Sequence, residues 1–361
     1  MNRTSISAVA SGLLCVLVAA GPSPGREKPR AAAFELPRQW QYSAPLISPE
    51  KRDTQPSVAQ KDPTCVFHSG KWHVFMTVKL KGVSAIEYCS FATWAKADQA
   101  RRTVLKVADS TYYCAPQVFY FVPHRRWYLI YQQGVPGARR MRIAFSTTTD
   151  IADPASWTKS RSIFRPGQKD PRKKGGLDYW VICDRQRAYL FFTTLNGQMW
   201  RMHTRLADFP HGFGDLGVAL RADIFEASHI YTLKGVGKYL NVIEANPGGR
   251  RYYKAYLADR LDGKWTPLAD SEHKPFAGAA NVRPLPGVPA WADNISHGEL
   301  IRAGNDQTLT VDPKDLRFVF QGALQKEKAG KPYGLIPWRL GMLTPITGAR
   351  GGGAGGGPNS R

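Results

Sequence analysis

Pairs of extended segments recur along the chain, and this repeat limits the folds that the chain can adopt. Each copy has a strand-like run, a basic or glycine-containing turn, and a second run with an aromatic residue near its start. The copies are residues 64–76, 115–134, 178–194, 225–245 and, more weakly, 296–311 with 316–322. Further extended segments follow, such as AIEYCSF (85–91) and MRIAFST (141–147). Short runs bounded by turn residues are typical of β-strands, and helical periodicity is nearly absent, so we expect an all-β chain.

Three or four short strands per copy, at intervals of roughly 50 to 70 residues, match what a β-propeller blade needs. A single blade cannot bury both of its faces, so each blade has to stack on its neighbours around a channel. We therefore predict a five-bladed β-propeller. A two-sheet sandwich is the alternative, because it is also built from short alternating strands.

Both ends of the chain are predicted to lie outside this domain. Residues 1–20 read as a secretory signal peptide, since the apolar run is too short to span a membrane and ends in small residues. An uncleaved anchor is the alternative. Residues 21–34 read as a disordered linker and residues 347–361 as a disordered Gly-rich tail, which leaves the propeller at 35–346. We expect a secreted protein, extracellular or periplasmic, with no membrane contact after signal cleavage.

The net charge is strongly positive, because 50 Lys and Arg stand against 28 Asp and Glu, a difference of 22. Much of this charge lies in turns, which favours a solvated surface or an anionic polymer as partner. We expect no nucleic acid, because recognised binding motifs are missing and the aromatic residues lie within strands. The cysteines beyond the signal segment lack C-x-x-C spacing, and we expect buried free thiols, with one disulfide as the alternative. They are Cys65, Cys89, Cys114 and Cys183.

The innermost strand of every blade starts at one rim of the channel, so its first residue points into a shared funnel. Pro63 lacks an amide hydrogen and belongs at the start of a strand, so we expect Asp62 at the entrance of a strand over residues 64–67. Burial and mutual repulsion in such a funnel would separate the pKa values of its carboxylates. The residues at this position in the five copies are Asp62, Gln117, Asp178, Glu226 and His297.

Glycoside hydrolysis with inversion requires at least two carboxyl groups with separated pKa values. Lys61 favours the ionised form of Asp62, as a general base requires. The apolar neighbours of Glu226 favour the protonated form that a general acid requires. Asp178 would then tune the pKa of the acid.

Each carboxylate also has a purely structural explanation. Asp62 precedes a proline and could form a turn, and Asp178 could bond to the backbone of its own loop, with Asp184 as the alternative candidate. Glu226 could form an ion pair with a nearby arginine. The same holds for Glu244, which we expect at the far end of a strand. The arginines concerned are Arg250 and Arg251.

Six segments resemble, in order, the signature segments of glycoside hydrolase family 62, the α-L-arabinofuranosidases. They are KDPTCVFHSGKWHVF (61–75), APQVFYFVPHRRWYLIYQ (115–132), LDYWVICD (177–184), FEASHIY (225–231), ISHGELIR (295–302) and YGLIPWRLGMLTP (333–345). The resemblance implies a five-bladed propeller, related to family 43, that removes single arabinofuranosyl groups from xylan with inversion. It also implies that Asp62 is the general base, Asp178 the pKa modulator and Glu226 the general acid.

The resemblance further implies roles for residues around the carboxylates. Lys61 and Tyr333 would line the arabinose pocket, and Gln117 and Arg251 would lie near the substrate. A structural calcium ion would bind at His297, with water supplying most of the oxygen ligands that calcium prefers. From the residue alone, this histidine is better explained as a hydrogen-bonding residue of the channel. No organic cofactor is expected.

The sequence departs from the family pattern at three places. Gly334 stands where the family usually has asparagine, and Gln133 stands where some members have an aromatic residue that stacks on xylose. A basic insert, RPGQKDPRKKGG (165–176), precedes Asp178 and could favour a polymer that carries glucuronic acid or a pectic polymer.

The leading hypothesis is a secreted, monomeric, inverting exo-acting α-L-arabinofuranosidase that acts on arabinose-decorated xylan. A non-catalytic carbohydrate-binding propeller is the first alternative. Another glycosidase specificity on the same fold, such as a β-xylosidase or an arabinanase, is the second.

Overall fold

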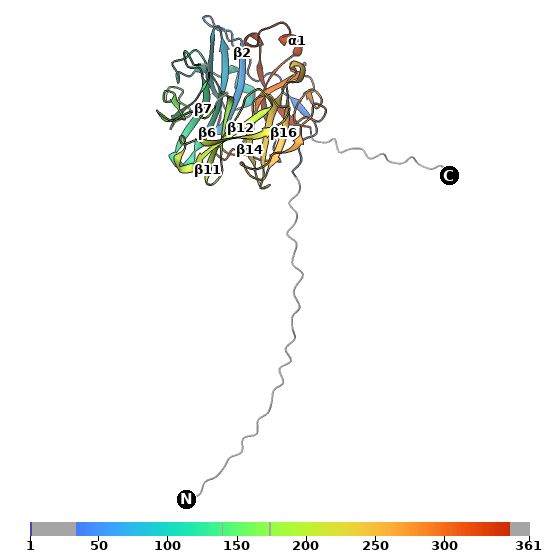
Figure 1. Ribbon diagram of the computed structural model, residues 1–361. Helices are drawn as coiled ribbons and strands as arrows, with labels where there is room; N and C mark the ends of the chain where they lie inside the picture. Colours follow the sequence, from blue (N-terminus) through green and yellow to red (C-terminus); the bar gives the residue numbers. More distant parts are fainter. Residues whose placement is uncertain (2–33, 139, 173–174, 347–361) are drawn as a thin grey trace, which may run out of the picture. The chain divides into compact units, whose positions relative to one another are not determined.

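Strands make up nearly all of the regular structure (Figure 1). The computed structural model describes residues 1, 34–138, 140–172 and 175–346. Contacts divide the chain after Ala33, and the unit that begins at Phe34 contains all the described strands. Three predicted segments lie outside the described residues. They are the signal peptide at 1–20 apart from Met1, the linker at 21–34 apart from residue 34, and the tail at 347–361. No described helix is long and apolar enough to cross a membrane.

Four antiparallel strands form each of the first three blades, and they follow chain order from the centre outward. Blade 1 consists of β2 (Ala59–His68), β3 (Lys71–Leu80), β4 (Val83–Phe91) and β5 (Arg102–Val104). Blade 2 consists of β6 (Tyr113–Phe121), β7 (Arg126–Gln133), β8 (Arg142–Thr148) and β9 (Arg161–Ser162). Blade 3 consists of β10 (Leu177–Cys183), β11 (Arg187–Thr193), β12 (Gln198–Arg205) and β13 (Gly214–Arg221).

The last two blades each have five strands, and blade 5 contains strands from both ends of the propeller. Blade 4 has β14 (His229–Leu233), β15 (Tyr239–Ala245), β16 (Tyr252–Ala258) and β17 (Thr266–Ala269), with β20 (Thr310–Val311) parallel to β14. Blade 5 has β19 (Asn294–Leu300), β21 (Phe318–Ala323), β22 (Arg339–Pro345), β1 (Trp40–Tyr42) and β18 (Val282–Pro284). Because β1 pairs with β22, the first described strand closes the ring against the last one.

Helical structure is limited to short turns between strands in the described residues. The single α-helical segment among these residues of the structure is α1 (Gln325–Lys328). The 3-10 turns are η1 (Trp94–Gln99), η2 (Val122–His124), η3 (Leu206–Asp208), η4 (Pro247–Gly249) and η5 (Tyr333–Leu335).

The predicted five-bladed β-propeller is confirmed, and the two-sheet sandwich is wrong. Strand bounds differ from prediction in blade 1, where β2 extends beyond residues 64–67 at both ends. The turn between β2 and β3 has positive φ at Ser69 (48°) and Gly70 (76°). Two such central residues match the twist of a tight β-hairpin, so both strands continue up to the turn.

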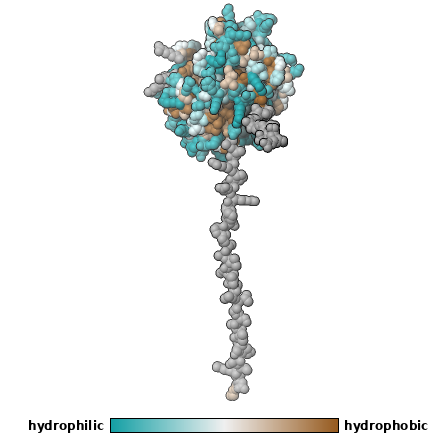
Figure 2. Space-filling model, turned by 90° about the vertical axis from the view of Figure 1, so that its right-hand side faces the viewer, coloured by the Kyte–Doolittle hydropathy of each residue, from teal (hydrophilic) through white to brown (hydrophobic). Residues whose placement is uncertain are grey.

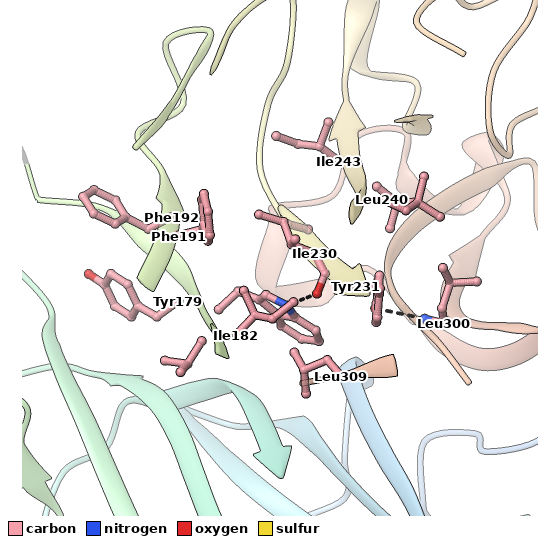
Figure 3. Packing of buried hydrophobic residues seen from close by; sticks show 14 of the residues in the cluster. Tyr179, Ile182, Phe191, Phe192, Ile230, Tyr231, Leu240, Ile243, Leu300 and Leu309 are labelled. Carbon is pink, nitrogen blue, oxygen red and sulfur yellow. Dashed lines mark hydrogen bonds between the residues drawn. The ribbon is translucent and has the colours of Figure 1, made fainter. Parts of the chain in front are cut away.

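The hydrophobic core lies between neighbouring blades. Figure 3 shows side chains of β10 and β11, such as Phe191 and Ile182, facing those of β14 and β15, such as Ile230 and Leu240. A strand covered on both faces reads as a nearly continuous apolar run, which explains β11. Hydrogen bonds cross between blades within this core, since the Tyr231 hydroxyl accepts the Leu300 N–H at 3.0 Å.

Polar residues cover most of the face in Figure 2, and hydrophobic residues are scattered among them. The cysteines of the described part are buried free thiols, as expected, and form no disulfide there. Burial raises the pKa of Cys89 to about 12, so this thiol stays protonated and unreactive at neutral pH.

Candidate active site

A β-bulge interrupts the innermost strand of four blades at an equivalent place. Strand pairing shifts between Lys61 and Thr64 in β2, between Cys114 and Gln117 in β6, between Leu177 and Trp180 in β10, and between Ser296 and Gly298 in β19. A bulge adds an unpaired residue and re-aims its side chain. The residues with positive φ at or next to this position are Asp62 (49°), Ala115 (51°), Asp178 (55°) and, just before β14, Ala227 (53°).

The predicted entrance position is therefore wrong in one respect. Asp62 does not precede the strand but lies inside β2, which begins at Ala59. The bulge explains the difference, because a residue that is unpaired within a strand can be followed by Pro63 without loss of a ladder hydrogen bond. Aspartate also tolerates the left-handed backbone better than most residues.

Asp62 is buried and surrounded by groups that favour its ionised form. Its backbone N–H donates to Gln321 Oε1 at 2.9 Å. Its carboxylate oxygens lie 3.9 Å from Lys61 Nζ and 3.3 Å from His297 Nδ1. Burial alone would raise the pKa of Asp62, but Lys61 and His297 outweigh burial and hold the pKa below its ordinary value.

Asp178 has the opposite electrostatic surroundings. Its backbone N–H donates to Gln132 Oε1 at 3.1 Å, and its Oδ2 accepts the N–H of Ala227 at 3.0 Å. Burial, followed by repulsion from Glu226 and Asp62, raises the pKa of Asp178 well above the ordinary value. Asp178 thus holds a proton more tightly than Asp62 and also fixes the backbone next to Glu226.

Glu226 lies in the segment before β14 and contacts Arg251, so the ion pair considered as a structural alternative does form. Arg251 Nη1 contacts Glu244 as well. Glu244 accepts hydrogen bonds from Ser296 Oγ at 2.9 Å and from the His297 N–H at 2.8 Å. Burial raises the pKa of Glu244 to about 7, with Glu226 adding to the rise and Arg251 opposing it.

Glu244 is the residue of this site that sequence reasoning missed. It does lie at the end of a strand, as expected, but β15 is antiparallel to β14, so its end returns to the edge where β14 starts. The Glu244 N–H donates to the Glu226 carbonyl at 2.9 Å. The signal that could have identified it is an acidic residue at the end of the second strand, directly across a hairpin from the first.

The predicted pocket residues Lys61 and Tyr333 lie together. Lys61 Nζ donates to the Tyr333 hydroxyl at 3.3 Å and lies 4.6 Å from the centre of its ring. The Arg251 guanidinium lies 5.2 Å from the same ring. Tyr333 is 45% exposed, whereas Lys61 is partly buried and Arg251 is buried, so the tyrosine forms an outer wall beside two inner cations.

Gln117 is not brought together with these residues. Its side chain is fully buried, donates to the Val181 carbonyl and accepts the Val181 N–H, both at 2.7 Å. The bulge residue of blade 2 is Ala115, so the equivalence assigned to Gln117 is wrong by two positions. A contact between Gln117 and substrate stays a prediction, while its observed contacts join blades 2 and 3.

Asp184, considered as an alternative to Asp178, lies at the opposite end of β10. Its Oδ1 accepts the backbone N–H groups of Gln186 and Arg187 at 2.8 and 2.7 Å. These bonds are typical of an aspartate that stabilises a tight turn. Asp184 therefore belongs to the turn between β10 and β11.

His297 lies at the bulge of β19, with Nδ1 3.3 Å from Asp62 and 3.9 Å from Asp178. Burial lowers the pKa of His297 although Asp62 opposes this, so the ring is neutral near pH 7. The described residues contain no group of three or more His, Cys, Asp and Glu side chains placed to hold a metal ion. Since calcium prefers six to eight oxygen ligands, these side chains do not form a calcium cage, and the calcium ion stays a prediction.

Comparisons with known proteins show which family the chain resembles. Residues 39–344 match the family model described as glycosyl hydrolase family 62. The chain is 38% identical over 317 residues to α-L-arabinofuranosidase C of Cellvibrio japonicus (strain Ueda107), covering 86% of this chain. The match spans only 47% of that relative, so the chain corresponds to about half of its length.

Solved structures resemble the whole propeller. The catalytic domain of a family 62 α-L-arabinofuranosidase from Coprinopsis cinerea is 38% identical, with a TM-score of 0.78 over 85% of this chain and 97% of the other. The α-L-arabinofuranosidase from Podospora anserina in complex with cellotriose is 36% identical, with a TM-score of 0.76 over 86% and 98%.

Proposed function

The chain belongs to glycosyl hydrolase family 62, and we propose that it is a secreted, inverting, exo-acting α-L-arabinofuranosidase that releases arabinose side groups from arabinoxylan. One observation carries the proposal. Asp62 and Asp178, from different blades, both lie within 4 Å of His297 Nδ1, and Asp178 binds the backbone beside Glu226. The names of the similar proteins support the sugar that is released.

Asp62 is the general base of the proposed reaction. Its lowered pKa keeps it ionised, so it can remove a proton from a water molecule that attacks the anomeric carbon of arabinose. Glu226 is the general acid and gives its proton to the glycosidic oxygen as the bond from that oxygen to the anomeric carbon breaks. The new bond forms on the opposite face of the sugar, so arabinose leaves with inverted configuration. The two carboxyl groups then exchange protons with solvent.

Asp178, Lys61 and Tyr333 have supporting roles in this proposal. Asp178 fixes the backbone beside Glu226 and, when protonated, adds no negative charge next to the base. Lys61 and Tyr333 line the pocket for a single arabinofuranosyl group, which accounts for exo action. A relative that binds cellotriose supports an open cleft for the main chain of the polymer.

The test is to incubate the purified chain with arabinoxylan and to follow the products by proton NMR from the first seconds. Free arabinose that appears first as the β-anomer supports an inverting α-L-arabinofuranosidase. No released sugar would favour a carbohydrate-binding propeller, and xylose or arabino-oligosaccharides would favour another specificity. Secretion is tested separately by sequencing the N-terminus of protein from the medium or periplasm, with a mature chain expected to begin near residue 21.

A further inference from the structure

A pocket of about 620 Å³ lies at the outer part of blade 2, and the basic insert that precedes Asp178 forms part of its wall. We propose that this pocket binds the carboxylate of a hexuronic acid carried by the polysaccharide from which arabinose is removed. The inference rests on the proposed function and extends it to the class of polymer. Four arginines line the pocket together with Asp170, and they are Arg140, Arg142, Arg165 and Arg172.

The pocket lies at the same edge of blade 2 as the candidate active site. Arg142, the first residue of β8, pairs with Gln133 at the end of β7, and Gln133 pairs with Tyr113 at the start of β6. That edge carries the bulge at Ala115, which is equivalent to the bulge at Asp62. A polymer held at the active site therefore passes on the side of the molecule where these arginines lie.

One of the four positive charges is neutralised inside the wall of the pocket. Arg172 is 2% exposed and contacts the Asp170 carboxylate at 2.6 and 3.0 Å. It also donates to the Tyr179 hydroxyl and to the Met141 carbonyl. This pair ties the insert to the adjoining strands and makes the pocket wall rigid.

Three positive charges have no acidic partner. Arg140, Arg142 and Arg165 form no ion pair with any acidic residue in the described part of the chain. Arg165 is exposed, and Arg140 is exposed as well, although its Nη1 donates to the Arg172 carbonyl. Several cations around a concave surface raise the local concentration of anions, and guanidinium groups match carboxylates with paired hydrogen bonds.

Arg142 is held in place by two polar side chains of the same blade. Its Nη2 donates to Gln133 Oε1 at 2.6 Å and to Ser160 Oγ at 3.0 Å. Its buried Nε has no hydrogen-bond partner among the described residues. Gln133 and Ser160 therefore fix the orientation of the Arg142 guanidinium at the pocket wall.

The experiment that tests uronate recognition compares two forms of one polymer. Glucuronoarabinoxylan is used as isolated and after chemical reduction of its carboxyl groups, and kcat/KM for arabinose release is measured at low salt for both. We expect the native polymer to be favoured by roughly five- to twentyfold, and the preference to shrink at about 0.5 M salt because exposed charges are then screened. The variant Arg140→Gln/Arg165→Gln should bring the ratio close to one.

The matched control is Arg126→Gln, which removes an exposed arginine at the opposite end of β7 and should keep the ratio of the wild type. A wild-type ratio near one, or a double variant that keeps the preference, would overturn the inference. Inhibition of the wild type by polygalacturonate that the double variant loses would support the site and point to a pectic source of uronate.

Failure of the proposed function gives a different result. In that case no arabinose is released from either polymer. Calorimetry with a glucuronate-bearing xylo-oligosaccharide and its carboxyl-reduced form still tests the pocket, because binding needs no turnover. Equal affinity of the wild type for both oligosaccharides would refute uronate recognition, and tighter binding of the acidic one that the double variant loses would support it.

Discussion

Carboxylates only a few ångströms apart in this protein have opposite electrostatic surroundings. Asp62 lies beside Lys61, whereas Asp178 is buried between Asp62 and Glu226 without a cation at comparable distance. Lys61, the direct chain neighbour of Asp62, contributes most to this difference, and His297 adds to it. Burial alone would raise the pKa of every carboxyl in the site, so a nearby cation decides which one stays ionised.

Replacement of Asp62 by asparagine should abolish the function of the base without loss of fold. We expect kcat on arabinoxylan to fall by at least about a thousandfold, because the amide cannot accept a proton from water. In the wild type, the acidic limb of the kcat/KM profile should lie below pH 4, since the pKa of Asp62 is held below 3.8. Activity measurements from pH 3 to 9, with circular dichroism of both proteins, check this. An acidic limb near pH 6 would contradict the assignment.

Replacement of Glu226 by glutamine should separate substrates by their leaving groups. A polymer needs its glycosidic oxygen protonated, whereas a nitrophenolate leaves without a proton. We expect polymer hydrolysis to fall by roughly a thousandfold or more and 4-nitrophenyl α-L-arabinofuranoside hydrolysis by less than about a hundredfold. Equal losses on the two substrates would argue against Glu226 as the acid.

Glu244 should affect the pH profile through Arg251, which contacts Glu244 and Glu226 with the same nitrogen. The pKa of Glu244 is raised to about 7, so its charge beside Arg251 changes near neutral pH. We expect kcat/KM of the wild type to change as the pH passes through about 7, and Glu244→Gln to remove this change because the amide does not titrate. A merely structural role for Glu244 would lower kcat by the same factor at every pH.

The same group affects stability with a definite sign. Because burial raises the pKa of Glu244 from 4.5 to about 7, the folded state holds a proton that the unfolded state releases. The free energy of unfolding contributed by this group is thus full below pH 4.5 and is lost as the pH rises through 7. The wild type and Glu244→Gln are unfolded with urea at pH 5 and at pH 8. The free energy of unfolding should decrease less between pH 5 and pH 8 in the variant than in the wild type.

At the scale of elements, the recurring bulge brings the catalytic side chains together. Asp62 and Asp178 are the bulge residues of β2 and β10, while blade 2 has Ala115 and blade 5 has His297 at the same place. A regular strand would point alternate side chains to the two faces of a blade, where neighbouring blades cover them. In each bulged strand, the bulge turns one side chain out of this alternation and toward the shared rim.

The backbone before β10 depends on a glycine, which gives a prediction at this scale. Gly176 has φ of 152°, and a Cβ added there would overlap the Phe192 ring. In Gly176→Ala the segment that leads into Asp178 has to shift, so we expect roughly 2 kcal/mol lower unfolding free energy and a clear loss of kcat. Gly217→Ala in β13 is the control, since a Cβ there has nothing within 4 Å. Equal behaviour of the two variants would contradict the prediction.

The repeat made the blades predictable from the sequence, but the register in which their strands pair could not be predicted. Ala115-Pro116 corresponds to Asp62-Pro63, and the two dipeptides lie at equivalent bulges of β6 and β2. When each strand is considered alone, Gln117 aligns with Asp62. A bulge is a relation between two strands, so neither strand alone reveals it. Glu244 was missed for the same reason, because only the hairpin brings it back to Glu226.

At the scale of the whole molecule, the site depends on closure of the ring. Blade 5 carries His297 on its innermost strand and contains β1 from the start of the described chain next to β22 from its end. The sequence repeat did not reveal β1, which has only three residues. β1 covers the edge of β22 within blade 5. Blade 5 also contacts blade 1 directly, where Gln321 Oε1 accepts the backbone N–H of Asp62.

Trp40 in β1 should therefore matter for the entire propeller. Its ring is fully buried, its Nε1 donates to the Phe276 carbonyl at 2.7 Å, and its centre lies 5.3 Å from the Phe276 ring. Trp40→Ala removes this anchor, and we expect the unfolding free energy to fall by about 3–5 kcal/mol, as is usual for a large buried aromatic side chain. Because the active-site residues come from several blades, loss of closure should also lower activity at temperatures below the melting point.

Gln41→Ala, on the same strand but only half-buried, should change stability by less than about 1 kcal/mol. Urea unfolding followed by tryptophan fluorescence and by arabinose release checks both variants, and a Trp40→Ala protein as stable as Gln41→Ala would show that β1 does not hold the ring together.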